Sequence, residues 1–157
     1  MATTYYFEEE RLKPAVAAYL NSGCNFNEVS SHLKKQMRLF MQEDIPTICL
    51  SDGKNYIESH FTKDAINDFR KNYSNVKFSN LREKILVVTK WRFVTRYEDS
   101  RTSFTSYQNI SIHLIVENFR PLMYEKVAPK CFNSPCIFRD ADIQCLIKNK
   151  RQEAIQQ

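Results

Sequence analysis

The stretch ICLSDGKNYIESHFTKDAI, residues 48–66, is typical of a β-hairpin followed directly by a helix. Its Asp-Gly pair separates two runs in which apolar and polar residues alternate, and this is the strongest short-range signal for a hairpin. The two strands are expected over residues 45–51 and 55–61. Thr62 is a good helix N-cap, and the apolar spacing after it predicts a helix over residues 63–72.

Two long strands are expected downstream of this unit. Residues 84–96, KILVVTKWRFVTR, are apolar on both faces in the first half and on one face in the second, which is typical of a sheet that curls into a small barrel. One face carries Ile85, Val87, Thr89, Trp91 and Phe93, and the other carries Leu86, Val88, Lys90, Arg92, Val94 and Arg96. After a turn at residues 97–100, a partner strand is expected over residues 104–119, stopped by Arg120-Pro121. Its core face is expected to be Ile110, Ile112, Leu114 and Val116.

Helices are expected at both ends of the chain. Residues 8–21 carry apolar side chains at helical spacing, and Gly23 follows as a C-terminal glycine. Those apolar positions are Leu12, Val16, Tyr19 and Leu20. A last helix is expected from a cap at Asp140 to about residue 153, with an apolar stripe of Ile143, Leu146 and Ile147. Residues 29–41 fit a helix or a strand, and periodicity alone does not choose between them.

This order of elements predicts a mainly β protein with flanking helices. A five-stranded barrel with a helix between its third and fourth strands is the oligonucleotide-binding (OB) arrangement. We expect an OB-fold domain with its N-terminal helix over residues 1–122, and a loop with an amphipathic C-terminal helix over residues 123–157. A terminal helix of this kind either packs on the barrel or docks a partner.

Composition excludes several classes of protein. The chain has 157 residues, of which 43% are hydrophobic and 26% charged, as in an ordinary single globular domain. No apolar run is long enough for a membrane helix, and the N-terminus lacks signal-peptide features, so we expect an intracellular protein with reduced thiols. With only two glycines, phosphate-binding glycine loops are not expected. The net charge of +5 permits contact with nucleic acid without requiring it.

Catalytic and metal-binding motifs are not found. No nucleophile elbow, zinc-protease helix, phosphate loop or C-x-x-C pair occurs, so we expect no enzyme and no cofactor. The three histidines are far apart in the sequence, and His113 is expected to be a surface or groove residue. Cys131, Cys136 and Cys145 lack the tight spacing of a zinc pair, so no metal site is expected.

A basic and aromatic segment is the candidate for nucleic-acid contact. Residues 82–101 carry six basic residues against three acidic ones, with aromatic residues interleaved, as in grooves that bind single strands. Trp91 and Phe93 share a face with Ile85 and Val87, so we interpret these two rings as core. The candidate nucleic-acid-binding residues are therefore Lys54, Tyr56, Lys90, Arg92, Arg96, Tyr97 and Tyr107.

Four segments in this order carry a resemblance to a known family: LKPAV at 12–16, SDG at 51–53, TKDA at 62–65 and NFRPL at 118–122. Over residues 11–122 the chain resembles the OB-fold telomere family of the adrenocortical dysplasia protein and the yeast telomerase subunit. The resemblance implies a nuclear, non-enzymatic subunit of a telomere-capping complex. Such a subunit bridges a single-strand-binding partner to other cap components and itself binds DNA weakly. It also implies that residues 29–41 are the first barrel strand.

Two departures from the family pattern bear on partners. The family contacts telomerase through an acidic cluster after the middle helix, whereas residues 68–73 here include Arg70 and Lys71, which puts telomerase recruitment in doubt. The family's serine-rich linker after the barrel is replaced by the C-terminal helix. Ile143, Leu146 and Ile147 are therefore the predicted partner-binding residues. The competing hypotheses are a stand-alone single-strand-binding OB protein and an unrelated α+β adaptor without nucleic acid.

Overall fold

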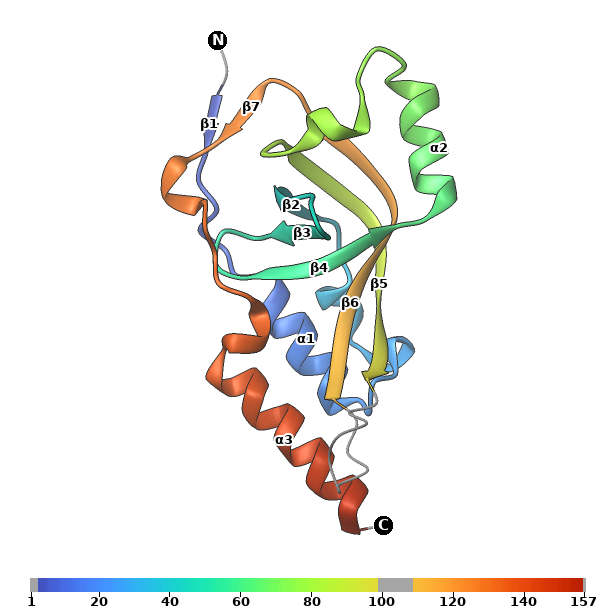
Figure 1. Ribbon diagram of the computed structural model, residues 1–157, viewed down its shortest axis with the longest axis vertical. Helices are drawn as coiled ribbons and strands as arrows, with labels where there is room; N and C mark the ends of the chain where they lie inside the picture. The colour runs from blue at the N-terminus through green and yellow to red at the C-terminus, as the bar shows by residue number, and fades with distance from the viewer. Residues whose placement is uncertain (1–2, 99–108, 157) are drawn as a thin grey trace.

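Five strands close into a barrel in the order β2-β3-β4-β6-β5, in a computed structural model that describes residues 3–98 and 109–156 (Figure 1). The strands are β2 (Met37–Glu43), β3 (Ile48–Ser51), β4 (Tyr56–Phe61), β5 (Ile85–Glu98) and β6 (Asn109–Leu122). β4 and β6 pair in parallel, and the other barrel pairs are antiparallel. The helix α2 (Lys63–Asn72) connects β4 to β5. The predicted OB-fold class is therefore confirmed.

The hairpin and the helix after it lie where the sequence places them. Gly53 has φ +87°, and a Cβ there would lie 2.4 Å from the Cβ of Phe7, so the turn requires glycine. The Thr62 hydroxyl accepts a hydrogen bond from the Ala65 N–H at 3.1 Å and caps α2. β3 begins later than predicted, at Ile48, because Pro46 has no N–H to donate to a sheet.

The predicted face assignment of β5 is wrong in its first half. Val88 pairs with Phe119 and Lys90 with Asn118, so Thr89 is one extra residue in β5. This bulge shifts the alternation, so that Leu86 and Val88 lie in the same main core as Trp91 and Phe93. Ile85 packs in a second apolar cluster, which also contains Phe7, Phe40, Val127, Ala128 and Cys131.

The ends of the long strands also differ from prediction. β5 continues through Glu98, so the predicted turn at residues 97–100 does not begin at Tyr97. β6 runs through Arg120 and Pro121, which pair with Val87 and Leu86. The rest of that turn and the first part of the predicted partner strand lie outside the described residues. Ile112, Leu114 and Val116 are buried, as predicted for its core face.

Only part of the ambiguous 29–41 stretch is a strand. β2 begins at Met37, and two 3-10 turns, at Phe26–Glu28 and Ser31–Leu33, precede it. Val29 lies between these turns with only 5% exposure and packs in the main core. The first half of this stretch therefore covers the core without joining the sheet.

The N-terminal helix α1 (Leu12–Asn21) lies below the barrel in Figure 1 and starts four residues later than predicted. Gly23 and Cys24 donate backbone hydrogen bonds to the Leu20 and Tyr19 carbonyls, which is a Schellman ending. At its start, the Asp52 carboxylate accepts from the N–H groups of Arg11 and Leu12 at 2.8 and 2.9 Å. The predicted apolar positions of this helix are buried.

The C-terminal segment packs on the rest of the molecule. β7 (Glu125–Val127) pairs in parallel with β1 (Thr3–Tyr5), and α3 (Ala141–Gln156) packs along α1. Asp140 caps α3, as predicted, by accepting from the Ile143 N–H at 3.1 Å. Among the described residues, none of the helices is long and apolar enough to cross a membrane.

An ion-pair cluster holds α3 against α1. The Lys13 ammonium lies 3.0 Å from the Asp140 carboxylate and 2.9 Å from that of Asp142. The hydrogen bonds to Asp142 and Asp140 raise the pKa of Lys13. Burial opposes ionisation of Asp140, but Lys13 and the Ile143 N–H outweigh it and hold the pKa of Asp140 below its usual value. The cluster is therefore charged at neutral pH and joins the two terminal helices electrostatically.

Candidate functional site

The basic residues of β5 face outward but are partly neutralised. Lys90 and Arg92 are exposed, and both reach the same carboxylate. Lys90 Nζ lies 3.5 Å from Glu117 Oε2, and Arg92 Nε lies 3.1 Å from Glu117 Oε1. Glu117 is the extra residue of a bulge in β6, since Asn118 pairs with Lys90 and Val116 with Trp91. Arg96 is exposed further along β5.

Trp91 and Phe93 lie in the core, which confirms their interpretation as core rings. They are 5% and 3% exposed, with ring centroids 5.2 Å apart. Phe26 packs edge-on against both rings, and the Trp91 indole N–H donates to the Lys35 carbonyl at 3.1 Å. These two rings are therefore not available to stack on bases.

Among the candidates whose side chains are described, Lys54 and Tyr56 lie on a different part of the barrel from Arg96. β6 lies between β4, which begins at Tyr56, and β5, which carries Arg96. Lys54 is exposed on the hairpin turn, whereas Tyr56 is half-buried. Burial and the neighbouring Cys136 raise the pKa of Tyr56. Tyr97 belongs to the last part of β5, and Tyr107 lies outside the described residues, so the binding role of the set stays a prediction.

The apolar stripe of α3 mostly faces the protein. Ile143 is fully buried in the main core, so it is not available to a partner in this arrangement. Leu146 and Ile147 are half-buried and pack against the same core, which leaves part of each side chain accessible. Within the part of the chain that the structure describes, the most exposed large apolar side chains lie elsewhere: Tyr124 at 84%, Ile45 at 78% and Tyr6 at 52%.

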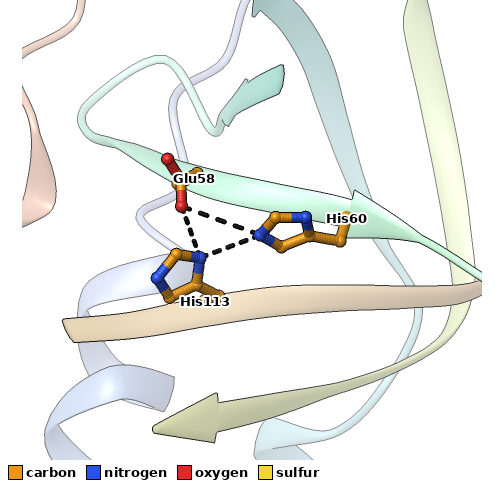
Figure 2. A group of neighbouring side chains, drawn as sticks. All are labelled: Glu58, His60 and His113. Atoms are coloured by element: carbon orange, nitrogen blue, oxygen red, sulfur yellow. Dashed lines mark hydrogen bonds and ion pairs between the residues drawn. The ribbon is translucent and has the colours of Figure 1, made fainter. Parts of the chain in front are cut away.

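One polar cluster was missed by sequence reasoning. Glu58 and His60 on β4 meet His113 on β6, with their ligand atoms within 4.8 Å of one another (Figure 2). His113 is only 6% exposed, so the expectation of a surface or groove residue is wrong. The OB order already places the third strand beside the fifth, and Glu58-x-His60 points both side chains to one face. The register that aligns them with His113 is not visible in the sequence.

Comparison with known proteins places this chain in a family. Residues 21–157 match the family model of the telomere-binding protein beta subunit (TEBP beta). The telomere-binding protein subunits beta of Stylonychia mytilus and Sterkiella nova are each 31% identical to the chain, over 96% and 95% of its length. The chain spans 38% of the length of each of these relatives.

A solved structure supports the fold independently. The Est3 telomerase subunit of the yeast Hansenula polymorpha superposes with a TM-score of 0.63 at 13% identity, over 96% of this chain and 89% of the yeast chain. At this identity the likeness concerns the fold alone, and it agrees with the closed barrel. Together with the family match, it identifies the chain as an OB-fold member of the telomere-binding protein beta subunit family.

Proposed function

We propose that this chain is a non-enzymatic subunit of a telomere-capping complex in the nucleus, where it bridges a single-strand-binding partner to other cap components. The observation that carries the proposal is the family match over residues 21–157. Both curated relatives bear names that describe them as subunits of a telomere-binding protein. The other cap subunits are its expected partners. Leu146 and Ile147, whose side chains are partly accessible, are the residues predicted to contact them.

Weak DNA binding by the chain alone is part of the proposal. Binding to single strands needs both positive charge along the phosphates and rings that stack on bases. The side chains of Trp91 and Phe93 are in the core, and Glu117 shares its charge between Lys90 and Arg92. The outward face of β5 therefore supplies modest charge, and these two rings do not add to it.

Fluorescence anisotropy with a labelled telomeric single strand tests the proposal. The chain alone is expected to bind at micromolar affinity or weaker at near-physiological salt. The single-strand-binding telomere subunit of the same species, added to chain and DNA, is expected to give a ternary complex. Substituting Leu146→Asp with Ile147→Asp should weaken that complex, while Asp68→Ala on α2 should not. Tight binding by the chain alone, with a steep salt dependence, would instead support a stand-alone binder.

Replacing Glu117 by glutamine is expected to strengthen single-strand binding by about 3- to 10-fold, or roughly 1 kcal/mol. The change frees Lys90 and Arg92 from their shared counter-charge. The slope of log affinity against log salt should also steepen by about one unit, because one more phosphate is neutralised. Glu125→Gln is the matched control, because it alters net charge equally while its partner is Arg38. Equal effects of the two variants would contradict a local role for Glu117.

A further inference from the structure

The side chains of Glu58, His60 and His113 converge on the face of the β4–β6 pair that points away from the main core, where His113 is covered by its neighbours. The parallel register of Ser59 with Leu114 sets Glu58 beside His113. Ser59, between Glu58 and His60, is 2% exposed, which leaves its two neighbours on the opposite face of the strand. Figure 2 shows the three side chains pointing toward one another.

The separations within this cluster are short. His113 Nδ1 lies 2.5 Å from Glu58 Oε2 and 2.9 Å from His60 Nε2. His60 Nε2 lies 3.7 Å from the same Glu58 oxygen. On the other side of its ring, His113 Nε2 lies 2.7 Å from Ser111 Oγ. All four side chains therefore take part in one connected polar group.

A cation satisfies the cluster in the tautomer of His113 that carries its proton on Nε2. A neutral imidazole carries one N–H, so when His113 donates from Nε2 to Ser111, its Nδ1 presents a lone pair. That lone pair then faces the Glu58 carboxylate and His60 Nε2. In this tautomer three electron-pair donors surround one point and are stabilised by positive charge among them, whereas an N–H at Nδ1 would instead donate to Glu58. A proton joins two of these atoms at a time, whereas a metal ion accepts a lone pair from all three.

We propose that Glu58, His60 and His113 bind one divalent transition-metal ion of the zinc class. Two imidazole nitrogens and a carboxylate oxygen form a ligand set that Zn²⁺ accepts, and three protein ligands leave one position for water or a partner group. The longest separation, 3.7 Å, lets a single ion reach all three atoms at about 2.0–2.2 Å. Ser111 fits the outer partner that orients a ligating histidine.

Access and selectivity also fit this proposal. The side chains of His60 and Glu58 are 40% and 32% exposed, so an ion can enter from solvent, while His113 supplies a buried anchor. Cys49 pairs with Glu58 across β3 and β4, but the group whose ligand atoms lie within 4.8 Å of one another consists of Glu58, His60 and His113. The site is therefore assigned nitrogen and oxygen ligands only. A bound ion would join the parallel strands β4 and β6.

Optical titration of the full chain with Co²⁺, under a non-chelating reductant, tests the site. One equivalent should give a visible d–d band without thiolate charge transfer, and Zn²⁺ should displace it. His60→Gln and His113→Gln should each weaken binding by more than about 10-fold, and Ser111→Ala by about 10-fold. His32→Gln, which alters an exposed histidine outside the cluster, should leave Co²⁺ binding unchanged.

Thermal unfolding with and without Zn²⁺ gives a second readout. The midpoint of the wild-type chain should rise with the ion, and that rise should be absent in His60→Gln, which alters a half-exposed side chain and leaves the buried His113 in place. The proposal is overturned by an absence of stoichiometric Co²⁺ binding or by thiolate charge transfer. It is also overturned if folded His60→Gln and His113→Gln proteins bind Co²⁺ as the wild type does.

Discussion

Replacing Asp52 by alanine is expected to lower the free energy of unfolding by about 3–5 kcal/mol. The Asp52 carboxylate is fully buried and accepts four backbone hydrogen bonds. One oxygen takes the N–H groups of Arg11 and Leu12, and the other takes those of Lys54 and Asn55, at 2.8–3.0 Å. The substitution removes the acceptor for all four donors at once. Urea unfolding followed by circular dichroism measures the loss.

Two further variants isolate the cause of that loss. Asp52→Asn keeps one carbonyl oxygen, so it should retain one pair of hydrogen bonds. Its free energy of unfolding should therefore lie between those of the wild type and Asp52→Ala. Asp68→Ala removes an exposed carboxylate from α2 and should change stability by no more than about 0.5 kcal/mol. Equal stability of Asp52→Ala and Asp68→Ala would show that the buried carboxylate does not hold α1 to the hairpin.

Asp52 also shows what local sequence rules can and cannot predict. The Asp-Gly pair predicts the turn, because the hydrogen bonds to Lys54 and Asn55 lie within three residues. The second role of Asp52, capping α1, joins residues 40 positions apart and follows from the closed fold. Sequence patterns report local geometry, so the hairpin and α2 were predicted and the long-range cap was not.

The faces of β5 were mispredicted for a related reason. Strict alternation assigns side chains correctly only until a bulge adds a residue, and Thr89 adds one. Because Glu117 is the extra residue of β6 at the same place, Lys90 and Arg92 share an acidic partner that the sequence did not reveal. The outward position of Lys90 and Arg92 was thus predictable, whereas their pairing with Glu117 depends on the strand register.

The terminal helix illustrates an alternative that the sequence left open. Its apolar stripe predicted either packing or docking, and both helix and stripe were located correctly. Ile143 is buried against the core, whereas Leu146 and Ile147 are only half-buried. Whether the helix packs or docks depends on whether this chain offers a surface for it to pack on. The helix α1 offers that surface, with Lys13 facing Asp140 and Asp142. Periodicity within one helix carries no information about that surface.

Replacing Trp91 by alanine is expected to lower the free energy of unfolding by about 3–5 kcal/mol, because it removes a large ring from a closely packed core. The indole packs against Phe26 and Phe93 and donates to the Lys35 carbonyl. The ring therefore holds the segment before β2 against the barrel. Trp91→Phe keeps an aromatic ring and should lose less, mainly the hydrogen bond and part of the packing. Urea unfolding of both variants gives the two values.

The same residue distinguishes a core ring from a base-stacking ring. Trp91 is the single tryptophan of the chain, so its intrinsic fluorescence reports on this site alone. With 5% exposure, it should emit as a buried indole, resist quenching by iodide, and keep its intensity when a telomeric single strand is added. Trp91→Phe should then bind DNA as the wild type does. A ring that stacked on a base would be quenched by the strand, and its replacement would cost about 1–3 kcal/mol of binding.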